Sequence, residues 1–242
     1  MNVVPLIPRS GSLFAGVLFF LLGVFWSVAR ADGMQPETTV VILYEEEGEA
    51  SIHIKNTDGG PALLHSAVES IPEDLESLVV ITPPVTRVDA GETQLVRFLT
   101  ANSQPLKTQR LKRVTFEGIP QRKTGPGATV GISLRQNLPL ILHPKGLARH
   151  PAPWKELTWH LDGARLVVRN GSPYVVRLSP ELELNPHKVS VMLSRGYVLP
   201  GETLAIETDA TQPAATSVTL QPATVYGFAV ARHEAPILVE AL

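Results

Sequence analysis

The stretch ITPPVTRVDAGETQLVRF, residues 81–98, decides how this chain folds. It joins an apolar run, a Pro-Pro break, an alternating run, an Asp-Ala-Gly turn and a second alternating run. Proline cannot donate a ladder hydrogen bond and glycine supplies the backbone freedom that turns need, so these residues separate strands. Side chains along a strand alternate between two faces, so the alternating runs predict half-buried strands. The stretch therefore predicts a β fold.

The same pattern extends along the chain on both sides of this stretch. Short alternating or β-branched runs are separated by Gly, Pro, Asn and Asp, and no long window holds an apolar period of 3.6 residues. Seven strands suit one immunoglobulin-like sandwich. We expect them at 39–44, 50–56, 62–70, 78–82, 93–99, 110–118 and 129–142.

A segment dense in proline and glycine, HPKGLARHPAP at 143–153, cannot sustain a sheet ladder and predicts a linker. Beyond it the strand pattern restarts and predicts a second, shorter β sandwich. The predicted division is a first domain at 32–146, a linker at 147–153 and a second domain at 154–242. Strands of the second domain are expected at 157–161, 165–170, 175–178, 189–193, 196–199, 203–207, 217–220 and 226–231.

The first thirty residues have the pattern of an export signal. Residues 11–29 carry no charge and include LFAGVLFFLLGVFW, with Arg9 before this run and Ala29-Arg30-Ala31 after it. A basic start, an apolar centre and an A-x-A site predict a signal peptide at 1–31 and a mature protein that begins at Asp32. The rival interpretation is an uncleaved anchor, since the run is nearly long enough to span a bilayer of ~30 Å.

Composition narrows the classes of function. The chain has 242 residues, 44% of them hydrophobic, and a net charge of -2, which suits two folded domains and excludes an overall basic field for nucleic acid. It has no cysteine, so thiol chemistry and thiolate zinc sites are excluded. The seven histidines show no HxxxH or HExxH spacing, and no G-x-S-x-G or P-loop motif occurs. We expect no catalytic residue, metal or cofactor.

Several segments resemble those of the periplasmic chaperones of the chaperone-usher pathway. The stretch at 81–98 resembles their PP-x-x-R-x-x-x-G-x-x-x-x-x-R segment. The order and spacing of the segments carry the resemblance, since each alone is weak. In the first domain, two further segments are similar to the family's: LKRVTFEGIPQR (111–122) to a strand ending in Ile-Pro, and SLRQNLPLILHP (133–144) to the strand that closes the domain. In the second domain, LVVRNGSPYVVRLS (166–179) is similar to an N-x-(S/T)-P-Y stretch. Two last segments stand where the family has its last strands: RGYVLPGETLAI (195–206) and ATVYGFAVARHEAPILVEAL (223–242).

The resemblance implies two immunoglobulin-like domains in tandem, set at an angle, in a periplasmic protein that is not an enzyme. Its partners would be pilus subunits and an outer-membrane usher. A subunit lacking its final strand would receive a strand from the chaperone, in donor-strand complementation. The alternative function is that of a secreted two-domain adhesin or surface module with the same strand pattern. A periplasmic enzyme has no supporting constellation of residues.

The donor segment implied by the resemblance is 129–134. In it Val130, Ile132 and Leu134 share one face, because strand side chains alternate with period two. Each buried side chain of this size contributes about 1.5–3 kcal/mol, so the row of three could drive subunit capture. The alternative is that the row packs in its own core. The short stretch before it places the chain with the short-loop members of the family.

The family's best-known members anchor the subunit's terminal carboxylate with an Arg near the first strand and a Lys in the closing strand. Aligning the strand ends puts Thr39 or Val40 at the first position and Pro139 at the second. Neither basic residue is present. The anchor is therefore either lost or moved to other basic residues of the same cleft.

We favour a relocated anchor made of Arg113 and Arg135. Arg135 precedes Pro139 by four residues, which preserves the strand face. A divergent, archaic-like branch of the family has arginines at similar positions, together with the R-x-x-x-P-L pattern seen at 135–140. A guanidinium can also grip a carboxylate with two parallel hydrogen bonds. Lys112 and Arg97 are the next candidates, and the alternative is that these arginines are solvated surface charges.

Overall fold

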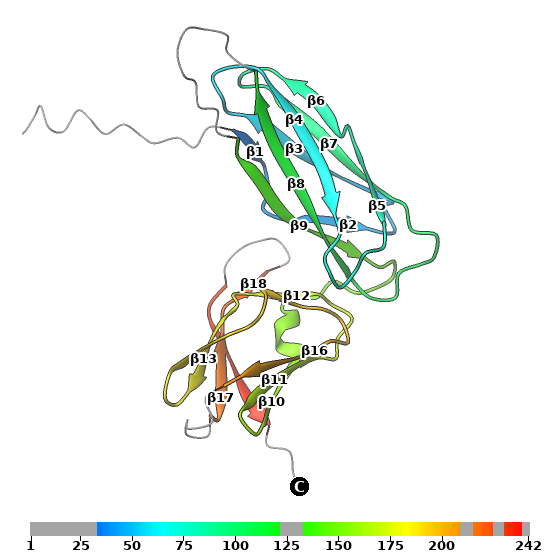
Figure 1. The fold of residues 1–242 in the computed structure, drawn as a ribbon. Coiled ribbons are helices and arrows are strands. Elements are labelled where there is room, and N and C mark those ends of the chain that lie inside the picture. Colours follow the sequence, from blue (N-terminus) through cyan, green and yellow to red (C-terminus); the bar gives the residue numbers. More distant parts are fainter. Residues whose placement is uncertain (1–32, 122–132, 209–214, 225–229, 239–242) are drawn as a thin grey trace, which may run out of the picture. The chain divides into compact units, whose positions relative to one another are not determined.

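A computed structural model describes residues 33–121, 133–208, 215–224 and 230–238 (Figure 1). The expected signal peptide, 1–31, lies outside the described residues. Two β sandwiches follow one another along the described chain, which confirms the expectation of an all-β protein with two sandwich domains. Within those ranges, no helix is long and apolar enough to cross a membrane.

The first sandwich is made of two sheets. One has the strand order β1-β3-β7-β5 and the other has the order β2-β9-β8-β4-β6. All neighbours are antiparallel except β2 and β9, which run parallel. The strands are β1 Met34–Pro36, β2 Val41–Tyr44, β3 Glu49–Asn56, β4 Ala62–Glu69, β5 Val79–Thr82, β6 Val85–Val88, β7 Thr93–Thr100, β8 Arg110–Pro120 and β9 Arg135–His143.

The stretch at 81–98 carries the chain from one sheet to the other and back. The two prolines, Pro83 and Pro84, separate β5 of the first sheet from β6 of the second. The turn after β6 closes with the Glu92 amide donating to the Asp89 carbonyl at 3.0 Å. Gly91 in this turn has a φ of 78°, a value that strains residues with a side chain. The turn then leads into β7 and returns the chain to the first sheet.

Alternation places one face of each central strand in the core between the sheets. Along β7, for example, Val96 and Phe98 are fully buried while Leu95 and Arg97 are exposed. Complete burial of such side chains contributes about 1.5–3 kcal/mol each, which substitutes for the disulfides that this chain lacks. On β3, β7 and β8 the apolar side chains buried in this core include Ile52, Ile54, Val96, Phe98, Val114 and Phe116.

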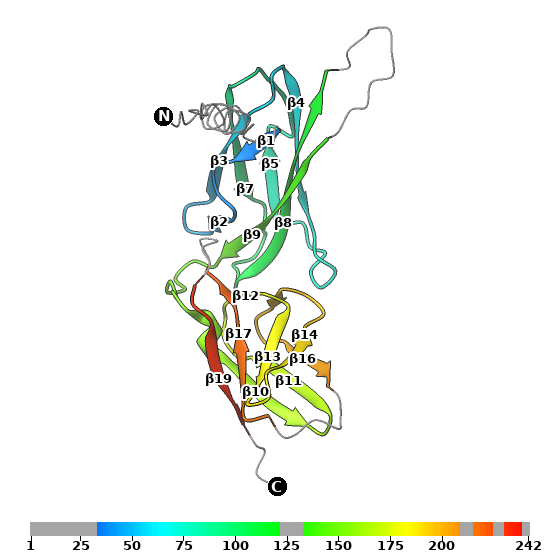
Figure 2. The ribbon, with the colours of Figure 1, turned by 90° about the vertical axis from the view of Figure 1, so that its left-hand side faces the viewer.

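The second sandwich has a sheet with the order β14-β13-β17-β19-β10-β11-β16 and a small sheet with the order β15-β12-β18 (Figure 2). Trp159 is the largest fully buried side chain of its core, which also contains Trp154. The elements are a 3-10 helix η1 Pro153–Glu156 and the strands β10 Leu157–Asp162, β11 Arg165–Asn170, β12 Val176–Leu178, β13 Glu181–Asn185, β14 Val189–Met192, β15 Tyr197–Val198, β16 Thr203–Glu207, β17 Ser217–Leu220, β18 Pro222–Ala223 and β19 His233–Leu238.

The two domains are built around the same polar corner. Asn56 and Asn170 are fully buried, and each exchanges backbone hydrogen bonds with the start of a Gly-Glu-Thr tripeptide, at 91–93 and 201–203 respectively. Each asparagine side chain also donates to backbone carbonyls of neighbouring segments. These bonds satisfy polar groups that would otherwise be costly to bury. The repeated corner indicates that the chain repeats one structural plan.

The last strand differs from the prediction. A strand was expected at 226–231, but residues 230–231 are not in a strand and 226–229 lie outside the described residues. The strand is β19 instead, which the sequence argues against because it contains Pro236. The structure accommodates this proline because its nitrogen faces away from the β17 side, where the next residue, Ile237, donates its amide to the Thr216 carbonyl (3.0 Å), and the pairing with β10 begins only at Ile237.

Candidate functional site

The first half of β9 has an open edge. β8 pairs with β9 along Arg135 to Leu142, whereas β2 pairs only with the stretch from Leu140 to His143. The segment 135–139 therefore has no strand on its second side among the described residues. A free edge presents backbone N–H and C=O groups that another chain can pair with. This edge is a ready template for an added strand.

An apolar row leads out of the core along β9 toward this edge. In β9, Leu138 and Leu140 are buried at 6% and 0% exposure, and Leu134, which immediately precedes the strand and continues its period-two row, is 44% exposed. Val130 and Ile132, the other members of the predicted donor row, lie outside the described residues. Of the predicted donor row, the structure thus describes only Leu134, whose apolar side chain is partly open to solvent.

Arg113 lies opposite Pro139 in the ladder between β8 and β9. Directly opposite residues point to the same side of a sheet, so Arg113 stands beside the position where the family's Lys would be. Its Nε donates to Asn137 Oδ1 at 2.7 Å and its Nη2 donates to the Asn137 carbonyl at 2.8 Å. Burial lowers the pKa of Arg113, against the attraction of Tyr197 and Glu69. The guanidinium is half-buried, oriented and has hydrogen atoms to spare.

Arg135 lies on the same face of the sheet as Arg113, opposite Glu117. Its Nη2 makes an ion pair with Glu69 and donates to Thr115 Oγ1 at 3.3 Å. The side chains of Arg135 and Glu69 are 50% and 39% exposed, so this pair is a surface pair of small net strength. The structure therefore brings both predicted arginines to one face, with Glu69 close to each.

None of the residues that align with the family's basic anchor is charged, and Thr39, one of the two alternatives for the first position, is exposed. Val40 is 7% exposed and packs with Leu111, Ile141 and Val175 in a cluster that joins the two domains. Pro139 is buried as well. A carboxylate would therefore meet no charge at these positions, and any cation for it must come from neighbouring residues.

The two runners-up do not share the face of Arg113. Lys112, the next residue on β8, points to the opposite side and its side chain is 2% exposed. Its Nζ lies 2.8 Å from Asp74 Oδ1, and Arg110 pairs with the same carboxylate. Arg97 is on β7 in the other sheet and pairs with Glu49. Both cations are occupied away from the open edge.

We expect Asp74→Asn to destabilise the first domain by about 3–5 kcal/mol, because it leaves the buried Lys112 without a counter-charge. Burial opposes ionisation of Asp74, but its bonds to Arg110 and Lys112 dominate and lower its pKa. The stabilisation is thus complete above the ordinary carboxyl pKa and is lost as the pH falls through the lowered value. Urea unfolding at neutral and acidic pH measures both effects.

The matched control for this prediction is Asp89→Asn. Asp89 pairs with Arg87 at the surface, where both side chains are more than half exposed, so the loss should stay below ~1 kcal/mol. Equal stability losses for the two variants would contradict the role assigned to Asp74.

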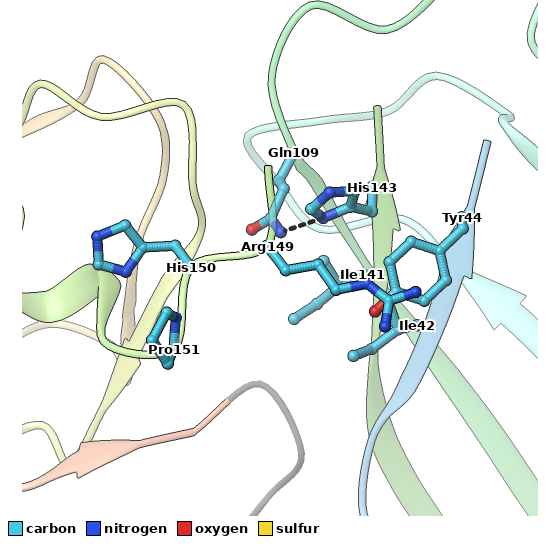
Figure 3. Close-up of a pocket in the computed structure, with 8 residues that line it drawn as sticks. All are labelled: Ile42, Tyr44, Gln109, Ile141, His143, Arg149, His150 and Pro151. Carbon is cyan, nitrogen blue, oxygen red and sulfur yellow. Dashed lines mark hydrogen bonds between the residues drawn. The ribbon is translucent and has the colours of Figure 1, made fainter. Parts of the chain in front are cut away.

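The two domains are held together by a buried hydrogen-bond network around Gln109. Its amide donates to the Pro173 carbonyl and its Oε1 accepts from the Val175 amide, both at 2.9 Å. Its Nε2 lies 2.9 Å from His143 Nδ1, and His143 Nε2 donates to the Leu147 carbonyl at 2.8 Å (Figure 3). The adjoining cavity of about 100 Å³ is smaller than the clefts that hold small-molecule ligands. It is lined by Ile42, Tyr44, Gln109, Ile141, His143, Arg149, His150 and Pro151.

Two residues that orient the arginines are not evident from the sequence. Asn137 fixes Arg113, and Glu69 pairs with Arg135. The one available signal for Asn137 is that a polar residue directly precedes the apolar run 138–142. The sequence contains no such signal for Glu69, because its nearness to Arg135 depends on the register of β4 against β8.

Comparison with known proteins gives matches in both domains. The family model for the N-terminal domain of PapD, described as a pili and flagellar-assembly chaperone, matches residues 33–148. The model for the C-terminal domain of the pili assembly chaperone PapD matches residues 152–234.

Individual chaperones are similar to this chain in sequence or in structure. The uncharacterized fimbrial chaperone YhcA of Escherichia coli (strain K12) is 42% identical over 200 residues, which cover 82% of this chain and 88% of the relative. A chain from the Salmonella enterica SafA pilin complex with the SafB chaperone aligns with a TM-score of 0.72 at 17% identity, over 86% of this chain and 98% of that one. The Pseudomonas aeruginosa CupB2 chaperone aligns with a TM-score of 0.68 at 22% identity, over 84% and 100%. The structural likenesses show that both sandwiches have the fold of these proteins.

Proposed function

Because this chain belongs to the family of pili-assembly chaperones, we propose that it captures pilus subunits by lending them the strand that ends in β9. The observation that carries the proposal is the open edge at 135–139, which continues from the apolar donor row and lies beside a basic face. The alternative of an adhesin is not favoured, since both matching models are those of chaperone domains.

In strand donation, the backbone and the side chains of the donated strand make different contacts with the subunit. The free N–H and C=O groups of 135–138 and of the preceding residues pair with a subunit edge, while Pro139 ends the row of donors. Val130, Ile132 and Leu134 fill the groove that the subunit's missing strand leaves open. Three such side chains contribute on the order of 5–9 kcal/mol before the cost of association is subtracted.

Arg113 and Arg135 hold the terminal carboxylate of the subunit in this proposal. Arg113 offers the guanidinium hydrogens that Asn137 leaves unused, and Arg135 turns from Glu69 toward the incoming group. Breaking the ion pair of Arg135 with Glu69 costs little free energy because both side chains are partly exposed to solvent. Bidentate bonds between guanidinium and carboxylate also fix the register of the added strand.

Co-expression with subunits encoded beside its gene tests the proposal. The tagged chaperone should co-purify with a subunit in a stable complex. A subunit whose groove is already filled by a strand fused to its own end is the control, and it should not bind. Equal recovery of both subunits, or of neither, would contradict capture by strand donation.

We also propose that the mature protein works in the periplasm and hands its subunits to an outer-membrane usher. The export signal supports the location, with Ala29 and Ala31 at the two small-residue positions of a cleavage site. N-terminal sequencing of periplasmic extract should therefore find a protein that starts at Asp32. A protein that starts at Met1 in the membrane fraction would show that the segment is an anchor.

A further inference from the structure

A third arginine, Arg177, faces the junction of the two domains. It lies in β12, where Val176 and Leu178 point into the core of the second domain at 0% and 4% exposure. Arg177 therefore points to the other side of the strand, as Val175 does. Val175 packs against the first domain in the cluster that contains Leu111.

Arg113 occupies the equivalent place on the first domain. It follows Leu111 by two residues on the same face of β8, just as Arg177 follows Val175. Leu111 and Val175 belong to one buried cluster at the junction of the domains. On the same faces of their strands, Arg113 and Arg177 are the next residues after these two. Their charges interact, since the pKa of Arg177 is lowered first by burial and then by repulsion from Arg113.

Arg177 has no counter-ion among the described residues. Its Nη1 is buried and has no hydrogen-bond partner. The acids beside its neighbours are engaged elsewhere: Glu69, near Arg113, pairs with Arg135, and Glu73 pairs with Arg195 and accepts a hydrogen bond from the Tyr197 hydroxyl. A buried donor left without a partner costs about 1–3 kcal/mol, and more when it is charged.

Tyr197, which lies opposite Arg177 in the ladder, cannot supply the missing negative charge. Burial and the hydrogen bond to Glu73 raise the pKa of Tyr197 to about 12. The phenol therefore stays neutral at physiological pH. Arg113 and Arg177 are thus two half-buried guanidinium groups at the junction that repel each other, and neither has an ion pair among the described residues. A carboxylate placed between them would be attracted by both.

We propose that Arg177 and Arg113 bind the subunit's terminal carboxylate between them, so that the anchor draws on both domains. The inference rests on the proposed function and extends it, because the second domain then takes part in recognising the subunit. A carboxylate has two oxygens with about four acceptor sites, enough for guanidinium groups on two sides. Arg177 gains the partner that its buried Nη1 lacks.

The first test uses a synthetic peptide with the last fifteen or so residues of a subunit encoded beside the chaperone gene. It is made with a free terminal carboxylate and as the terminal amide. Arg177→Ala should weaken binding of the free acid by about 30-fold or more and leave binding of the amide unchanged. Arg177→Lys should restore part of the loss. Arg169→Ala, an exposed arginine of the same domain, is the control and should bind like wild type.

A second readout separates this inference from the proposed function. The side-chain Nε–Hε NMR signals of Arg113 and Arg177 should shift together and saturably with sodium acetate, but not with sodium chloride at equal ionic strength. If wild type binds no subunit peptide, the proposed function fails, and the acetate response still decides the anion site. Wild-type affinity of Arg177→Ala for the free acid, or an Arg177 signal unmoved by acetate, would overturn the inference.

Discussion

We expect Arg113→Ala and Arg135→Ala each to prevent stable complexes with pilus subunits, while the free chaperone remains folded. Either substitution deprives a desolvated carboxylate of charge-assisted hydrogen bonds, a loss that costs several kcal/mol in a buried pair. The fold needs neither charge, since Arg113 bonds only to Asn137 among described residues and the pair of Arg135 with Glu69 is partly exposed. Recovery of subunit with the tagged chaperone measures the effect.

A variant that carries both Arg113→Ala and Arg135→Ala gives a further test of this prediction. Because both arginines serve one carboxylate, the double variant should be little worse than either single one. Arg97→Ala is a matched control, since this arginine lies on the other sheet and pairs with Glu49. If both single variants hold subunits as tightly as wild type, the relocated anchor is wrong.

Ile132→Asp abolishes subunit capture in our account. The aspartate would enter an apolar groove, where a carboxylate loses its water and finds no partner. Leu95→Asp is the control, because this exposed apolar side chain lies on β7 in the other sheet, away from the open edge. Circular dichroism of the free proteins checks that both variants fold. Normal co-purification of Ile132→Asp with subunits would remove Ile132 from the interface.

Most strands of the first domain follow from the sequence because one face of each is buried. Alternation predicted β3, β4 and β7 to within one residue at each end. β13 was missed, although Glu181–Asn185 alternates, because prolines stand on both sides of it. β1 was missed because three residues are too few for a pattern. Local periodicity therefore fails to identify a strand where prolines flank a short alternating run, or where the strand is too short to show a period.

The candidate site was predictable in part. Period two alone puts Arg135 on the face of Pro139, and the structure adds Arg113 to that face through the register of β8 against β9. The partners of these arginines depend on contacts across strands and domains. Asn137 and Arg177 therefore acquire their roles only in the folded protein.

Hydrogen exchange of backbone amides tests most directly whether the chaperone lends its strand. Amides that enter a new ladder become protected, whereas those that merely face a partner exchange almost as before. Comparison of the free chaperone with its purified subunit complex should show strong new protection over 129–138 and little change over β3 and β7. If 129–138 exchanges equally fast in both states while the subunit stays bound, strand donation by this segment is contradicted.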